Sequence, residues 1–154
     1  MNTLLNKLLG VTTICFLILM GCDSSQVVED SIPKISKPFV FNPSVKLIAI
    51  DPGSFVRVTD QQQNITISQK FWIGTHEITQ SKFESLMGNN PSFFKGENLP
   101  VDKVTFEQAV SFCKALTLND LKEGRIRENM FYRLPSEAEW EFACLGGSNS
   151  PFSF

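Results

Sequence analysis

The chain has 154 residues, which is room for about one domain. Its hydrophobic fraction of 42% and charged fraction of 19% are those of an ordinary globular protein. Lys and Arg number 14 and Asp and Glu 16, which gives a net charge of -2. This near balance excludes broad electrostatic binding to nucleic acid, which needs a basic face. The single histidine, His76, excludes sites that require several imidazoles.

The first 22 residues predict an export signal rather than a part of the fold. Their only charged side chain is Lys7, which forms a small positive region with the amino terminus. Residues 8–20 are uncharged and mostly apolar, and this length is typical of the hydrophobic region of a signal peptide. A membrane-spanning helix needs about 20 apolar residues, and Asp23 closes the run too early.

The apolar run ends in Leu19-Met20-Gly21-Cys22, which resembles the bacterial lipobox. The resemblance implies that Cys22 is lipidated and that cleavage before it removes residues 1–21. An uncleaved anchor and a plain secretory signal are the alternatives. Because several acyl chains anchor a protein stably, we expect a lipoprotein of the bacterial cell envelope. The sequence leaves open whether its membrane is the inner or the outer one.

Residues 22–44 predict the lipidated cysteine followed by a flexible tether. They mix serine, proline and charge without a helical or strand period, and Pro33, Pro38 and Pro43 interrupt them. The folded part is therefore expected over residues 45–154.

The first part of the folded region predicts two or three short antiparallel strands joined by tight turns. Strand composition occurs at residues 45–50, 54–58, 65–67 and 71–73. Asp51-Pro52-Gly53 is a turn signal, and residues 60–64 predict a polar loop.

Two helices follow, each with its own start signal. Thr79 is a candidate N-cap, and Phe83, Leu86 and Met87 after it share one face before Gly88 ends the helix. Thr105 begins the second helix with Gln108 three residues on, which is a capping box. The expected buried stripe of the second helix is Phe106, Ala109, Val110, Cys113, and Leu116 or Thr117.

A third, short helix begins after Arg133-Leu134-Pro135. Ser136 is its N-cap, Glu139 completes a capping box, and Glu137 lies in the first turn where the helix dipole favours it. The spacing predicts that Trp140, Ala143 and Cys144 face the core. The acidic residues of this helix allow acid–base chemistry, but capping and solvent exposure explain them more simply.

Four ordered segments resemble one family, that of formylglycine-generating enzymes, also called the sulfatase-modifying factor domain. They are residues 71–79, 88–96, 99–109 and 133–143, the last reading Arg-Leu-Pro-Ser-Glu-Ala-Glu-Trp-Glu-Phe-Ala. The resemblance covers residues 47–154 and implies an α+β fold of the C-type lectin type. The last segment is expected to be scaffold: Pro135 and Ser136 fix the helix start, Trp140 anchors the helix in the core, and Arg133 pairs with Glu137 or Glu139.

The resemblance also implies where catalysis would lie. Members of the family oxidise a sulfatase cysteine to formylglycine with a cysteine pair and a copper ion, and Cu(I) favours thiolate ligands. Those cysteines and the calcium ligands belong to the second half of the domain, whereas the matching segments belong to the first half. We therefore expect no catalytic residue and no copper or calcium site in this chain.

The remaining candidates for chemistry have simpler interpretations. Cys113 and Cys144 are interpreted first as core thiols, with a disulfide second and a metal site last. His76 beside Glu77 supplies too few ligands for zinc, so a surface or packing role is expected.

Two functions fit these observations. The first is a membrane-anchored lipoprotein whose truncated domain binds a protein partner or assists envelope assembly without catalysis. The alternative is the N-terminal portion of a formylglycine-generating oxidase whose catalytic half is missing or separately encoded. The membrane, reached through Cys22, is the expected partner of both.

Overall fold

The computed structural model describes residues 18–21, 40–58 and 62–146, which form an α+β fold with short antiparallel strands and capped helices. Lys7, Cys15, Cys22 and residues 147–154 lie outside the described residues. The described strands are β1 (Ile18–Gly21), β2 (Leu47–Ile50), β3 (Gly53–Val58), β4 (Gln62–Ile67), β5 (Phe71–Gly74) and β6 (Met130–Arg133). The described helices are α2 (Gln80–Met87), α3 (Phe106–Lys122) and α4 (Glu137–Leu145).

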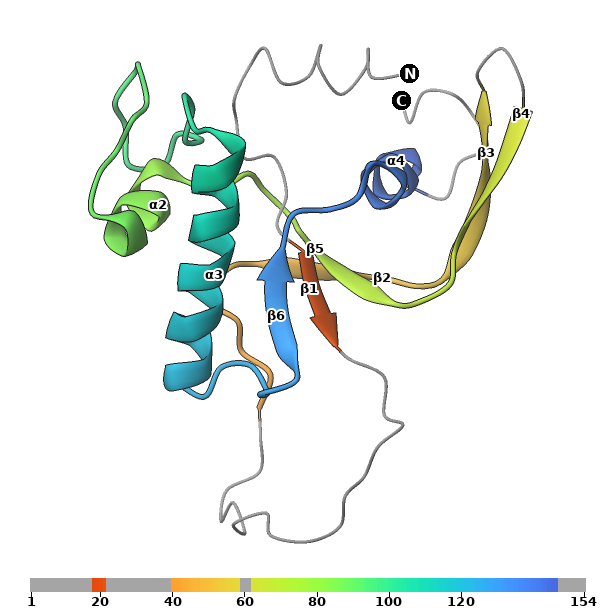
Figure 1. Ribbon diagram of the computed structural model, residues 1–154, viewed down its shortest axis with the longest axis horizontal. Helices are drawn as coiled ribbons and strands as arrows, with labels where there is room; N and C mark the ends of the chain where they lie inside the picture. The colour runs from red at the N-terminus through yellow and green to blue at the C-terminus, as the bar shows by residue number, and fades with distance from the viewer. Residues whose placement is uncertain (1–17, 22–39, 59–61, 147–154) are drawn as a thin grey trace, which may run out of the picture.

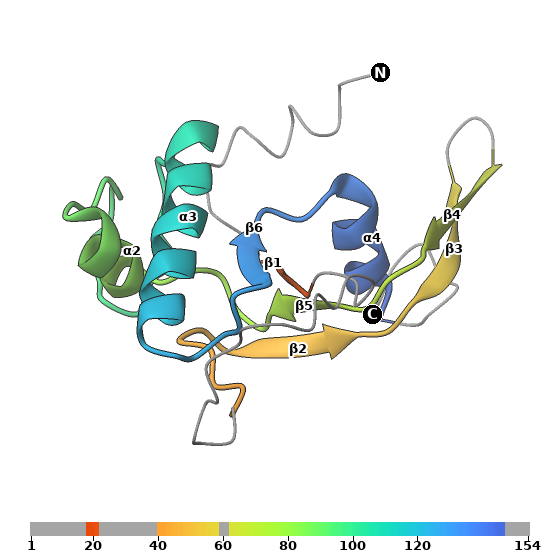
Figure 2. The same ribbon diagram turned by 60° about the horizontal axis from the view of Figure 1, so that its bottom comes forward.

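The described strands form two sheets. The larger has the order β2-β5-β1-β6, with every neighbouring pair antiparallel, and β3 and β4 form a separate hairpin. Helices α2 and α3 stand at one end of the molecule and the hairpin at the other, with α4 between them (Figures 1 and 2). The predicted antiparallel strands are confirmed, although β4 begins at Gln62, inside the segment expected to be a loop.

Two elements of the larger sheet are absent from the sequence-based prediction. Strand β6 precedes the Arg133 motif, and β1 belongs to the predicted signal peptide. Residues 18–21 are therefore part of this sheet, whereas the sequence placed them outside the fold. Their backbone pairs with β5 on one side and with β6 on the other. This pairing gives hydrogen-bond partners to backbone N–H and C=O groups of β5 and β6 that would otherwise have none in the sheet.

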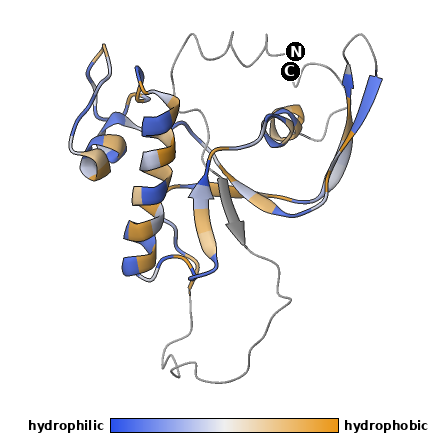
Figure 3. Ribbon diagram, viewed as in Figure 1, coloured by the Kyte–Doolittle hydropathy of each residue, from blue (hydrophilic) through white to orange (hydrophobic). Residues whose placement is uncertain are grey.

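The buried side chains form two clusters. The larger surrounds α3 and joins it to α2 and β6; its members are Ile78, Phe83, Val101, Val104, Ala109, Phe112, Cys113, Leu116, Ile126 and Tyr132. In the smaller cluster, Ile67, Phe71 and Ile73 pack against α4. Figure 3 shows hydrophobic and hydrophilic residues alternating along α3, as expected for a helix with one buried face.

The predicted helix starts are confirmed. The hydroxyl of Thr79 accepts a hydrogen bond from the backbone N–H of Lys82. Thr105 with Gln108, and Ser136 with Glu139, form complete capping boxes. Gly88 ends α2 with φ 77°, a left-handed conformation that glycine adopts without strain.

The buried stripe of α3 differs from the prediction at its first turn. Phe106 is 62% exposed, whereas Phe112 is completely buried. The predicted Ala109, Cys113 and Leu116 are buried. Phe106 follows the same spacing, but it is the first residue of the helix and extends beyond the core.

Helix α4 also differs from the prediction. Cys144 is exposed, and Trp140 is only half-buried rather than anchored in the core. The side chains of α4 that pack against the smaller cluster are Ala138, Phe142 and Ala143. A Cβ on Gly53 would lie 2.7 Å from the Phe142 ring, so glycine lets the start of β3 approach α4 closely without displacing this ring.

The last part of the predicted tether contacts the folded region. The backbone N–H of Asn42 donates to the carbonyl of Arg125 over 3.2 Å, and the rings of Phe41 and Trp72 have centroids 5.7 Å apart. The ordered domain therefore includes residues that the composition assigned to the tether. Within the described ranges, no helix is both long and apolar enough to cross a membrane.

Candidate functional site

The Arg133 motif joins β6 to α4 through a partly buried ion pair. The guanidinium of Arg133 donates to both carboxylate oxygens of Glu139, which resolves the predicted choice between Glu137 and Glu139. Glu139 also accepts from the backbone N–H of Ser136 at 2.8 Å. Burial by itself raises the pKa of the Glu139 carboxyl, but the hydrogen bonds from Arg133 and Ser136 outweigh it and hold this pKa below its usual range.

The other acidic residues of α4 bind the hairpin. Arg57 on β3 lies 2.6 Å from Glu141 and 3.7 Å from Glu137. The sequence placed both carboxylates on one face of the helix but did not identify Arg57, which lies 84 residues from Glu141. With Leu134 packed against the larger cluster, the motif acts as scaffold.

A second polar centre lies in the core around α3. Asp120 is completely buried and accepts hydrogen bonds from the backbone of Ser44 at 2.9 Å and the hydroxyl of Tyr132 at 2.6 Å. Burial raises the pKa of the Asp120 carboxyl, but these bonds and one from Asn119 together hold it below its usual range. Burial and the bond to Asp120 raise the pKa of Tyr132. The sequence analysis did not identify this centre, which fixes the segment before β2 against α3 and β6.

The two described thiols lie in different surroundings. Cys113 is buried, and burial raises its pKa to about 12, so the sulfur stays protonated at neutral pH. Cys144 is free and exposed on α4, and partial burial followed by the charge of Glu141 raises its pKa as well. The expected core position is thus confirmed for Cys113 and wrong for Cys144. Within the described part of the chain, no group of three or more His, Cys, Asp or Glu side chains could hold a metal ion.

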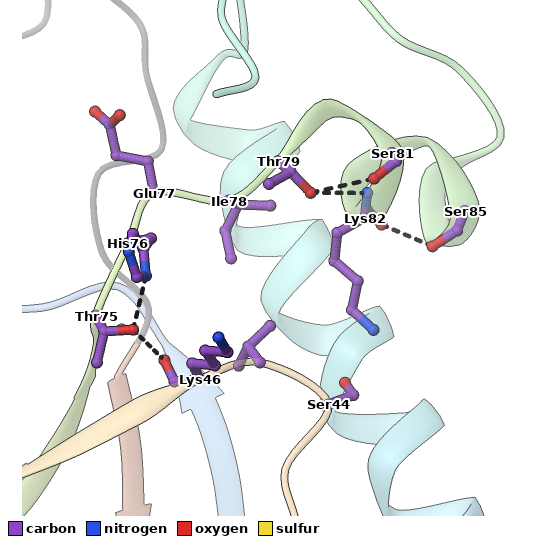
Figure 4. A pocket seen from close by; sticks show the side chains of 12 residues that line it. Ser44, Lys46, Thr75, His76, Glu77, Ile78, Thr79, Ser81, Lys82 and Ser85 are labelled. Atoms are coloured by element: carbon purple, nitrogen blue, oxygen red, sulfur yellow. Dashed lines mark hydrogen bonds between the residues drawn. The ribbon is translucent and has the colours of Figure 1, made fainter. Parts of the chain in front are cut away.

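An open groove of about 520 Å³ lies between the start of β2, the end of β5 and α2 (Figure 4). Its polar lining includes the ammonium groups of Lys46 and Lys82 and the hydroxyls of Ser44, Thr75, Thr79, Ser81 and Ser85. Exposed His76 bonds through Nδ1 to the hydroxyl of Thr75 at 2.9 Å, at the rim of the groove. Burial lowers the pKa of Lys82. The lining also includes the carboxylate of Glu77 and the apolar side chains of Val45 and Ile78, so the groove carries both signs of charge.

The loop of residues 89–105, here called the aromatic loop, is held by one buried amide. Gln80 is 2% exposed, and its nitrogen donates to the carbonyls of Phe94 and Pro100 at 2.9 and 3.1 Å. Its oxygen accepts from the side chain of Asn90 at 2.9 Å and the backbone of Gly96 at 3.1 Å. The Gln80 side chain, which belongs to α2, thus makes all four of these hydrogen bonds to residues of the aromatic loop.

The aromatic loop exposes large apolar side chains on this ordered frame. Phe93 and Phe94 are 64% and 72% exposed, their rings meet edge-to-face at 4.8 Å, and the ammonium of Lys103 lies 4.5 Å from the Phe93 ring centroid. Leu99 and Phe106 are also exposed. Exposed apolar groups on a fixed backbone are typical of protein-binding surfaces. The sequence analysis used this stretch only for the family resemblance and did not identify it as a binding surface, although two adjacent phenylalanines among glycine, asparagine and proline are a visible signal.

Comparison with known families matches residues 36–153 to the sulfatase-modifying factor enzyme 1-like domain. The chain belongs to this family. The match begins at residue 36, before the expected domain start, in agreement with the contacts of Phe41 and Asn42.

A curated relative in the family comparison is "Chaperone protein LppX" of Paenibacillus barcinonensis. It is 33% identical in the aligned region, which covers 68% of this chain and 46% of the relative. The chain therefore spans about half the length of this relative. No solved structure matches the chain. The resemblance inferred from the four segments is confirmed.

Proposed function

We propose that this chain is a membrane-anchored lipoprotein of the bacterial envelope that binds other proteins without catalysis, in a chaperone-like or assembly role. The observation that carries the proposal is the exposed pair Phe93 and Phe94 on a loop fixed by the buried Gln80. Fixed aromatic side chains bind apolar segments at low entropic cost. The name of the relative as a chaperone supports the same class of function.

The finer fold assignment belongs to this proposal. The family match supports a fold of the C-type lectin type, whose loops present binding residues on a scaffold of short strands and helices. The alternative function is the N-terminal portion of a formylglycine-generating oxidase, whose catalytic cysteine half would be missing or separately encoded.

Replacing both Phe93 and Phe94 with serine is expected to reduce protein binding while leaving the fold intact. Both rings are mostly exposed, so their loss removes apolar contact area for a partner and little packing within the domain. The measurement is suppression of the aggregation of reduced insulin, followed by light scattering, with every variant compared as the processed lipoprotein in the same detergent. We expect at least half of the suppression to be lost.

The matched control for the aromatic loop is Leu118→Ser. Leu118 is 69% exposed on α3, twelve residues beyond Phe106, and therefore about 18 Å along the helix axis. The Leu118→Ser variant should suppress insulin aggregation as well as the parent protein does. If the double serine variant suppresses aggregation as well as the parent protein and has the same thermal melt, the aromatic loop does not bind the client.

Lipidation is tested separately, by labelling growing cells with a palmitate analogue. The chain is expected to incorporate label, and Cys22→Ser is expected to abolish it because the thiol is the site of alkylation. Cys15→Ser, a change within the predicted leader, should leave labelling intact. Label that persists in Cys22→Ser would contradict the lipobox assignment.

A further inference from the structure

Strand β1 is the only described connection between the two parts of the larger sheet. It pairs with β5 at Ile18↔Ile73 and Leu19↔Trp72, and with β6 over all four of its residues. Figure 1 shows β1 beside β6, and β5 and β6 are not direct neighbours in the sheet order. Removal of β1 would therefore leave a space one strand wide, with β5 and β6 about 9.5 Å apart.

The predicted processing site coincides with the end of this strand. The lipobox places cleavage between Gly21 and Cys22, and β1 ends at Gly21. Cleavage would thus remove the whole of β1 from the sheet and expose the ladder groups of β5 and β6. Backbone groups left open in this way favour pairing with another strand.

The two walls of the resulting space are held by contacts that do not involve β1. Four register pairs join β5 to β2. Strand β6 is fixed to α3, because the hydroxyl of Tyr132 donates to Asp120 and its backbone N–H donates to Thr117 at 2.9 Å. Each wall therefore keeps its own support when β1 is absent. The space is also bordered by the core, since Phe71, Ile73 and Tyr132 are at most 4% exposed.

We propose that the space between β5 and β6 is a strand-binding site, which β1 fills before processing and which an extended apolar segment of a client polypeptide fills afterwards. This inference rests on the proposed function, because it needs both processing at Cys22 and a client. The bound segment would lie antiparallel to both walls, as β1 does. The leader thereby keeps the site closed until the protein reaches the membrane.

Strand β1, which fills the site in the structure, indicates what kind of segment would bind there. The sequence of β1, Ile-Leu-Met-Gly, is apolar and uncharged, and its pairing with β6 uses main-chain groups that any extended segment possesses. Binding through an added strand gives affinity from the backbone and tolerates many sequences. Such tolerance suits unfolded exported chains, which expose extended apolar segments before they fold.

The test measures binding of a fluorescent peptide with the sequence of residues 15–22 and serine in place of both cysteines. Two forms of the protein are compared in the same detergent: the processed lipoprotein extracted from membranes, and the Cys22→Ser precursor, which retains β1. The processed form is expected to bind at least tenfold more tightly, by fluorescence anisotropy. A peptide with Leu19→Pro should bind at least tenfold more weakly, because proline removes a ladder donor. Equal binding by both protein forms, or by both peptides, would overturn the proposal.

A second variant tests the site without processing. Leu19→Pro in the Cys22→Ser precursor weakens β1 in place and is expected to raise peptide binding at least tenfold, whereas Leu9→Pro, outside β1, should not. Hydrogen exchange should show peptide-dependent protection at residues 71–74 and 130–133 and none in β3 or β4. Unchanged binding by the Leu19→Pro precursor, or protection confined to other elements, would also count against the site.

Failure of this inference can be told apart from failure of the proposed function. If intact mass shows cleavage and lipidation at Cys22 but the peptide does not bind, the strand-binding site is wrong and the lipoprotein assignment stands. If membrane-extracted protein still carries residues 1–21, the site never opens and both proposals are wrong.

Discussion

Replacing Asp120 with alanine is expected to lower the free energy of unfolding by about 1–3 kcal/mol, the range for leaving a buried polar group without its hydrogen-bond partner. Asp120 is completely buried and accepts from Ser44, Asn119 and Tyr132. Alanine would leave the Tyr132 hydroxyl buried without its acceptor, which adds a desolvation penalty. Urea unfolding, followed by tryptophan fluorescence, measures the loss.

Two comparisons define the effect at Asp120. Asp51→Ala removes an exposed carboxylate, 2.8 Å from Lys70, and is expected to cost at most about 1 kcal/mol. Asp120→Asn preserves the shape but turns one acceptor into a donor that faces other donors, so it should also destabilise the fold. A loss at Asp120→Ala no larger than that at Asp51→Ala would contradict the structural role of the buried carboxylate.

The same residue predicts a pH dependence. The pKa of Asp120 in the folded protein lies below its usual range, so the carboxylate stabilises the fold above the unfolded pKa of about 4. This contribution is lost as the pH falls through the lower pKa of the folded state. The difference in stability between the parent and Asp120→Ala should therefore be constant near neutral pH and shrink below about pH 4.

The features that the sequence predicted well are local ones. The N-caps Thr79, Thr105 and Ser136 act on backbone groups three residues away, so their signal is complete within one turn of helix. The family resemblance also depends on short contiguous segments, and it is confirmed over residues 36–153.

The features that the sequence missed depend on distant partners. The bond from Ser44 to Asp120 spans 76 residues and that from Arg57 to Glu141 spans 84, so no local pattern marks either pair. Strand β1 shows the same limit, because its apolar residues fit both a leader and a strand, and only the open edges of β5 and β6 select the strand. Periodicity likewise could not show that Phe106 is exposed at the first turn of α3.

Phe112→Ala is expected to cost about 3–5 kcal/mol of unfolding free energy, the range for deleting a buried phenylalanine side chain. Phe112 is 0% exposed, and its ring stacks on that of Phe83 with centroids 5.3 Å apart, so it joins α3 to α2. Its truncation would leave a cavity between the helix that carries the Asp120 centre and the helix that begins with Gln80. Chemical unfolding of the Cys22→Ser protein measures this loss.

Phe106→Ala makes the same chemical change six residues earlier on the same helix. Because Phe106 is 62% exposed, its truncation should change stability by no more than about 0.5 kcal/mol. It should instead reduce suppression of insulin aggregation, since Phe106 adjoins the aromatic loop in sequence. If Phe106→Ala lowers stability as much as Phe112→Ala does, Phe106 belongs to the buried face of the helix, as its periodicity predicted. The expected opposite pattern separates the core of α3, which holds the scaffold together, from its first turn, which is available to a partner.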